Sequence, residues 1–160
     1  MKDPLATYLR DHLAGSHFAI KLLTSLGEQF NGQDLGAFAL ALRTDLQQDQ
    51  DTLEELLECV GKAQVDLSEV TGWLAERASQ CKLERAHSGA GIGTFEALET
   101  LTLGIQGKKA LWHALTLIRG FDKRIPALDF HGLISRAEGQ YRRTEKGRIQ
   151  LIDETFRQKT

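Results

Sequence analysis

Residues 34–60 repeat apolar side chains at alternating spacings of three and four along their whole length. This spacing puts the repeated positions on one face of an α-helix and does not fit the alternation of a β-strand. A helix of this length spans roughly 40 Å at 1.5 Å per residue. Such a long helix with one apolar stripe has to pack against other helices, which predicts a helical bundle. The stripe comprises Leu35, Ala39, Leu42, Leu46, Asp49, Leu53, Leu56 and Val60.

The same kind of periodicity predicts three more long helices and one shorter helix. They cover about residues 5–30, 94–119 and 128–156, and the shorter one covers about 66–84. The two prolines, Pro4 and Pro126, lie outside the helix interiors, where proline would break the helix. Residues placed to cap the helices are Asp3, Asp34, Asp129 and, at a C-terminus, Gly61. No useful stretch has the period of a strand, so we expect an all-α fold with residues 1–160 as a single domain.

The lengths of the connections predict how the helices are wired. Few residues join the first long helix to the second and the third to the fourth, so each pair should be antiparallel neighbours. The link between the second and third long helices is much longer and contains the short helix. A long middle connection is typical of ferritin-like antiparallel four-helix bundles and differs from simple up-down wiring. We therefore expect ferritin-like wiring, with the short helix in that crossover.

Composition and charge exclude several classes of partner. The formal net charge is −2, which provides no basic surface for nucleic acid. No run of about 18 apolar residues exists to span a membrane, and the N-terminus lacks the apolar stretch of a signal peptide. The two cysteines have no metal-ligand spacing, which favours a cytoplasmic protein with reduced thiols. The wide apolar surface of residues 94–119 predicts self-association as a homodimer.

Ferritin-like wiring allows a specific test for a di-metal site. Such a site takes a carboxylate from each of two helices and a Glu-x-x-His pair from each of the other two. The chain has one such pair, Glu84 and His87, at the end of the short helix. The second pair is missing, so we expect neither a standard di-iron centre nor a resident cofactor.

Four polar residues nevertheless lie in or beside the predicted apolar faces: His12, Asp49, Glu99 and Glu138. A buried charge has to be paired, hydrogen-bonded or bound to a metal. Three interpretations stay open. The four side chains form a metal or small-ligand pocket, for which iron, manganese or zinc would suit the donor types. Alternatively they form a polar network that fixes helix register, or the stripes are offset by one residue and the carboxylates are solvated.

Three short stretches carry a resemblance to a known family. The stretches resemble the corresponding sequence segments of a bacterial family of small ferritin-like helical proteins; they are residues 8–15, 103–112 and 128–130. The resemblance covers most of the chain in helix order and implies a ferritin-like four-helix bundle. It implies no activity, substrate or cofactor.

Two functions from different classes follow as expectations. The first is a non-catalytic binding or accessory protein, because the ligand pattern of a di-iron centre is incomplete. The alternative is a metal-binding protein or oxidoreductase with a non-standard carboxylate–histidine site. The sequence leans against an enzyme, assigns no catalytic residue and leaves the small-molecule ligand open.

Overall fold

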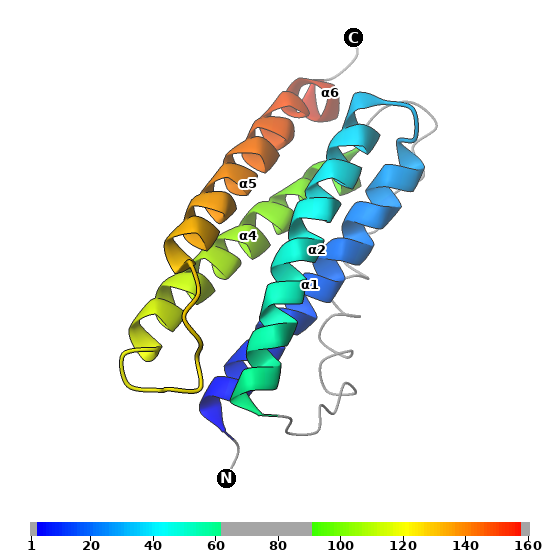
Figure 1. Ribbon diagram of the computed structural model, residues 1–160. Coiled ribbons are helices and arrows are strands. Elements are labelled where there is room, and N and C mark those ends of the chain that lie inside the picture. The colour runs from blue at the N-terminus through cyan, green and yellow to red at the C-terminus, as the bar shows by residue number, and fades with distance from the viewer. Residues whose placement is uncertain (1–2, 62–90, 158–160) are drawn as a thin grey trace.

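The computed structural model describes residues 3–61 and 91–157, which form a bundle of helices (Figure 1). The helices are α1 (Pro4–Gln29), α2 (Asp34–Val60), α4 (Ile92–Ile118), α5 (Phe130–Gln150) and α6 (Ile152–Phe156). These two ranges contain no strand, and none of their helices is both long and apolar enough to cross a membrane. The all-α prediction is confirmed, while the helix expected at residues 66–84 lies outside the described residues.

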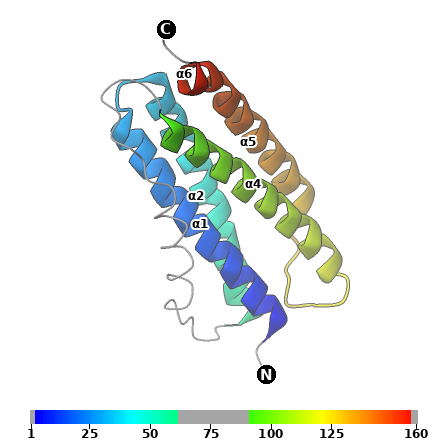
Figure 2. The same ribbon diagram turned by 180° about the vertical axis from the view of Figure 1, so that it is seen from behind.

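Two helical hairpins build the bundle. In the first, α1 packs along α2, and in the second, α4 packs along α5; α1 also contacts α4, and α2 contacts α5 (Figures 1 and 2). The C-terminal end of α2 lies beside the loop that follows α4, because Arg124 Nη1 donates a hydrogen bond to the Val60 carbonyl at 3.2 Å. It follows that α2 and α4 run in the same direction, so the C-terminal end of α2 and the N-terminal end of α4 lie at opposite ends of the bundle (Figure 1).

Most, but not all, of the helix caps predicted from the sequence are found in the structure. The Asp3 carboxylate accepts from the Leu5 amide at 3.0 Å, and Asp129 accepts from the Gly132 amide at 2.9 Å. Gly61 ends α2 with a φ of 120°, in the region that favours glycine. The predicted cap at Asp34 is wrong, because Asp34 is the first helical residue and Gln33 precedes it without a side-chain cap.

The last long helix is shorter than its periodicity predicts. A single helix was expected to Phe156, but α5 ends at Gln150 and α6 begins at Ile152. Between them, the Leu151 amide bonds to the Arg148 carbonyl three residues earlier at 3.2 Å. This tighter turn interrupts the α-helix, although the apolar spacing continues through it.

Two apolar clusters fill the bundle, one toward each end. The first is built on Leu9, Leu53, Leu56, Leu111, Trp112 and Leu115. The second is built on Leu23, Leu26, Leu42, Leu46, Leu98 and Ile105. Between them, in the middle of α2 and α5, lie the buried polar residues Asp49, Gln50, Gln140 and Thr144. The core is therefore divided by a polar layer, and this layer positions the candidate site.

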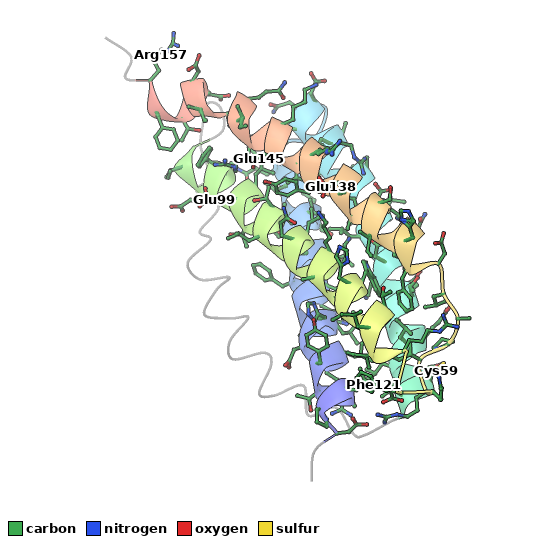
Figure 3. All side chains as sticks on the ribbon, turned by 90° about the vertical axis from the view of Figure 1, so that its left-hand side faces the viewer. Cys59, Glu99, Phe121, Glu138, Glu145 and Arg157 are labelled. Carbon is green, nitrogen blue, oxygen red and sulfur yellow. The ribbon has the colours of Figure 1, made fainter. Side chains whose placement is uncertain are left out.

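One face of α4 leaves large apolar side chains exposed. Leu103, Leu117 and Phe121 are exposed, and Phe121 lies at the end of the bundle where α4 terminates (Figure 3). The homodimer expected from the apolar surface of this helix stays a prediction.

A glycine at the α1–α2 turn provides a test of how closely the chain packs there. A Cβ on Gly36 would lie 2.1 Å from the Phe30 carbonyl oxygen, which belongs to the backbone and cannot move aside cheaply. We expect Gly36→Ala to lower the free energy of unfolding by about 1–3 kcal/mol, as overpacking does. Gly139→Ala, with nothing within 4 Å of the added atom, should instead raise it by about 0.5–1 kcal/mol. Urea unfolding measures both, and equal stabilities would contradict the close approach.

Candidate functional site

A buried ion pair occupies the centre of the polar layer. Asp49 on α2 is only 4% exposed, and Lys108 on α4 donates to its Oδ2 atom. Gln140 on α5 is fully buried and donates to the same oxygen at 2.9 Å, while its own Oε1 accepts from Lys108 at 2.5 Å. Three side chains from three helices thus satisfy one another in a closed triangle. Buried charges require such hydrogen-bonded pairing.

A second cation faces the same carboxylate. Arg136 Nε lies 3.3 Å from Asp49 Oδ1, which is within ion-pair distance. No donor in residues 3–61 or 91–157 is aligned for a hydrogen bond to that oxygen, so Oδ1 retains accepting capacity. The guanidinium also donates to the Asp45 carbonyl at 2.9 Å and to Gln48 at 2.8 Å. One buried carboxylate therefore faces two cations.

Burial works against the charge on Lys108. It lowers the pKa of the Lys108 ammonium, and the Asp49 carboxylate opposes that shift by raising the pKa. Arg136 lowers the Lys108 pKa further, because it is a like charge. The pairing with Asp49 thus favours the charged ammonium against the effect of burial.

A cavity of about 450 Å³ opens beside this ion pair, between α1 and α4, with part of α2 behind it. Its volume falls within the range typical of small-molecule sites. Most of its walls are apolar, and Asp49, Lys108, Gln50 and Ser16 supply polar atoms. Ser16 donates to Gln50 Oε1 at 2.8 Å, so that pair satisfies itself.

Three glycines open this cavity from both sides. Gly15 lies on α1 and Gly104 and Gly107 lie on α4, and all three line the cavity. A Cβ added to any of them would have no described neighbour within 4 Å. Each glycine inside a helix costs about 0.5–1 kcal/mol relative to alanine. No described residue packs closely against these glycines, so within the described ranges they leave space between α1 and α4.

One buried donor at this cavity has no partner. Trp112 lines the cavity and is fully buried, and its indole Nε1 has no hydrogen-bond partner among the described residues. An unsatisfied buried N–H is unfavourable by about 1–3 kcal/mol.

The four residues predicted from the sequence are not brought together. Asp49 is buried, as its place in the α2 stripe predicts. His12 is half-buried and lines the cavity. Its ring meets the Tyr8 ring edge-on, with 4.7 Å between the ring centroids. The inward orientation of Glu99 is wrong, because it is 52% exposed and pairs with Arg148 at 3.2 Å. Glu138 is bound at the bundle surface by Lys109 at 2.5 Å and by Arg142 at 3.2 Å. Figure 3 labels Glu99 on α4 and Glu138 on α5, at different levels of the bundle.

No metal centre emerges from these positions. Within residues 3–61 and 91–157, no three or more His, Cys, Asp or Glu side chains are grouped so that they could hold a metal ion. The carboxylates of Glu99 and Glu138 are engaged by cations, and Asp49 is engaged by Lys108. The physical reason is that each carboxylate has a basic neighbour nearer than another carboxylate.

Sequence reasoning missed three residues of this site: Lys108, Gln140 and Trp112. A pair of adjacent lysines in the middle of an apolar helix is the available signal for Lys108, because one of the two has to be turned toward the core. Gln140 follows Ala137 by three positions on α5, and both are buried. Nothing in the sequence distinguishes the tryptophan with an unpaired N–H from an ordinary core residue.

Comparison of the chain with protein families, with curated proteins and with solved structures finds no match to any of them. The site therefore has to be interpreted from its own geometry.

The ion pair predicts a large and specific effect on stability. We expect Asp49→Asn to lower the free energy of unfolding by about 3–5 kcal/mol, because it leaves Lys108 and Arg136 without their buried counter-charge. The double variant Asp49→Leu/Lys108→Met removes both charges and should recover most of that loss. Urea unfolding of the two variants measures the difference. A double variant no more stable than Asp49→Asn would refute the assignment.

His12 predicts a pH dependence of stability. Burial lowers the pKa of His12 from its ordinary 6.5, and the neighbouring Asp11 only partly offsets this shift. The unfolded chain therefore binds this proton more readily, so the free energy of unfolding falls as pH drops from about 6.5 toward the lower folded pKa. His12→Gln should remove that part of the decline. His17→Gln, which replaces an exposed histidine of α1, should leave the decline in place when thermal unfolding is followed from pH 7.5 to 5.

Proposed function

We propose that this protein is a non-catalytic helical-bundle binding protein, and that the cavity between α1 and α4 is its binding site for a small, largely apolar molecule. The observation that carries this proposal is the cavity of about 450 Å³ with mostly apolar walls between α1 and α4. Apolar surface in contact with water is unfavourable, and an occupant that contacts the walls removes this surface from water.

The glycines support the same proposal from a separate direction. A Cβ on Gly15, Gly104 or Gly107 would meet no described residue within 4 Å, and alanine at each position would favour the helix. Their presence on both walls of one cavity fits selection for room between α1 and α4. The polar groups behind the cavity support binding over catalysis, because Asp49 and Lys108 engage each other and Gln140.

The wiring of the bundle belongs to the same proposal. The parallel directions of α2 and α4, with the C-terminal end of α2 and the N-terminal end of α4 at opposite ends of the bundle (Figure 1), support ferritin-like wiring with one long crossover. The resemblance of residues 8–15 and 103–112 to small bacterial ferritin-like proteins is consistent with it. We propose that the bundle retains this architecture without a standard di-iron site.

A neutral fluorescent probe tests the binding site. N-phenyl-1-naphthylamine, an uncharged apolar molecule, should bind the full chain at one site per molecule with an increase in fluorescence. Gly15→Leu and Gly107→Leu place a side chain in the open space from α1 and from α4. We expect each to weaken probe binding by about tenfold or more, because the probe and the leucine compete for the same volume.

Gly139→Leu is the matched control. It makes the same exchange on α5, also with nothing within 4 Å of the added Cβ, and Gly139 does not line the cavity. It should bind the probe as the unchanged protein does. All three variants remove a helix glycine, so circular dichroism should show them folded. Unchanged binding by both cavity variants, or no binding by the unchanged protein, would refute the proposed site.

A further inference from the structure

The inner wall of the cavity contains a lysine with an unused hydrogen-bond donor. Lys108 lies on α4 and lines the cavity. Its ammonium has three N–H donors, of which Asp49 Oδ2 and Gln140 Oε1 accept two. The described residues supply no acceptor for the third donor.

The charge behind this wall is positive. Asp49 carries one negative charge and faces both Lys108 and Arg136, which leaves one positive charge in excess. The nearby Asp45 does not balance this excess, because Arg143 Nη2 holds its carboxylate at 2.5 Å. On the α1 side, His12 is neutral at pH 7 because burial lowers its pKa. Asp11 also lines the cavity, but it is exposed and screened by solvent.

Most of the remaining cavity wall is apolar. Phe18 and Ala19 of α1, Leu46 and Leu53 of α2, and Leu101 and Ile105 of α4 line it. A ligand that matches this surface has an apolar body and one anionic, hydrogen-bond-accepting end.

Resting on the proposed function, we infer that the occupant is an aliphatic carboxylate: its alkyl chain lies between α1 and α4, and its carboxylate accepts from Lys108. A carboxylate oxygen accepts the unused donor of the ammonium. It also neutralises the excess positive charge formed by Lys108, Arg136 and Asp49. A neutral alkyl ligand would fill the same space without neutralising that charge, and an alkylammonium would add to it.

Three probes with the same alkyl chain separate these cases. Decanoic acid, 1-decanol and decylammonium chloride are titrated into the full chain at pH 7.5, below the concentrations at which they aggregate. We expect decanoic acid to bind about tenfold or more tightly than 1-decanol, the ratio typical of a hydrogen bond to a charged partner. Decylammonium should bind most weakly. Isothermal titration calorimetry measures all three affinities.

Variants of adjacent lysines locate the source of the preference. Asp49→Leu/Lys108→Met removes the inner ion pair and should reduce the ratio between decanoic acid and 1-decanol to about threefold or less, while 1-decanol still binds. Lys109→Met is the matched control, because Lys109 pairs with Glu138 and does not line the cavity. It should keep the full ratio. Circular dichroism checks that both variants are folded.

The outcomes distinguish this inference from the function on which it rests. If 1-decanol or decylammonium binds as tightly as decanoic acid, or if the preference survives in a folded double variant, the carboxylate assignment is overturned and the apolar binding site stands. If none of the three binds and N-phenyl-1-naphthylamine does not bind either, both the inference and the proposed function are overturned.

Discussion

The buried ion pair between Asp49 and Lys108 is the constraint on which the rest of the bundle depends. Both charges have lost most of their water, so each requires the other within contact distance. Gln140 completes the triangle and brings in a third helix. Helices α2, α4 and α5 therefore have one register in which these three groups meet. A shift by one helical turn in any of them would leave a charge buried alone.

This constraint also shapes the space beside it. The polar layer separates two apolar clusters, and among the long helices of the described residues only α1 supplies no residue to the triangle. Beside the ion pair, Gly15 of α1 and Gly104 and Gly107 of α4 line the cavity. Larger side chains at these positions would occupy part of its volume. The cavity is thus bounded by rigid helices on its walls and by a fixed ion pair at its inner side. A rigid wall of this kind suits a site that binds a ligand without large rearrangement.

Much of the fold can be predicted from the spacing of apolar residues in the sequence. The candidate site can be predicted from it only in part. The α2 stripe predicts both the helix and the burial of Asp49. Apolar residues on one face over all 27 residues determine which face is buried, and Asp49 lies on that face. The same reasoning fails for Glu99, since α4 is apolar around much of its circumference and its orientation is poorly determined by periodicity. It fails at Leu151 too, where a local turn interrupts a continuing apolar pattern. The four candidate residues are not brought together in the described part of the chain, because periodicity orients a residue about one helix and does not identify its nearest cation.

The sequence by itself determined the all-α class, the bounds of α1, α2 and α4 within a few residues, and the presence of a charge in the apolar seam of α2. These are properties of one segment at a time, set by periodicity, capping residues and glycine. Only the tertiary structure decided that Asp49 meets Lys108 and Gln140, and that three glycines and Trp112 enclose one cavity. The reason is that these contacts join residues 32 to 91 positions apart in the chain. Such contacts depend on the relative rotation and register of whole helices, which packing and the pairing of buried charge select together.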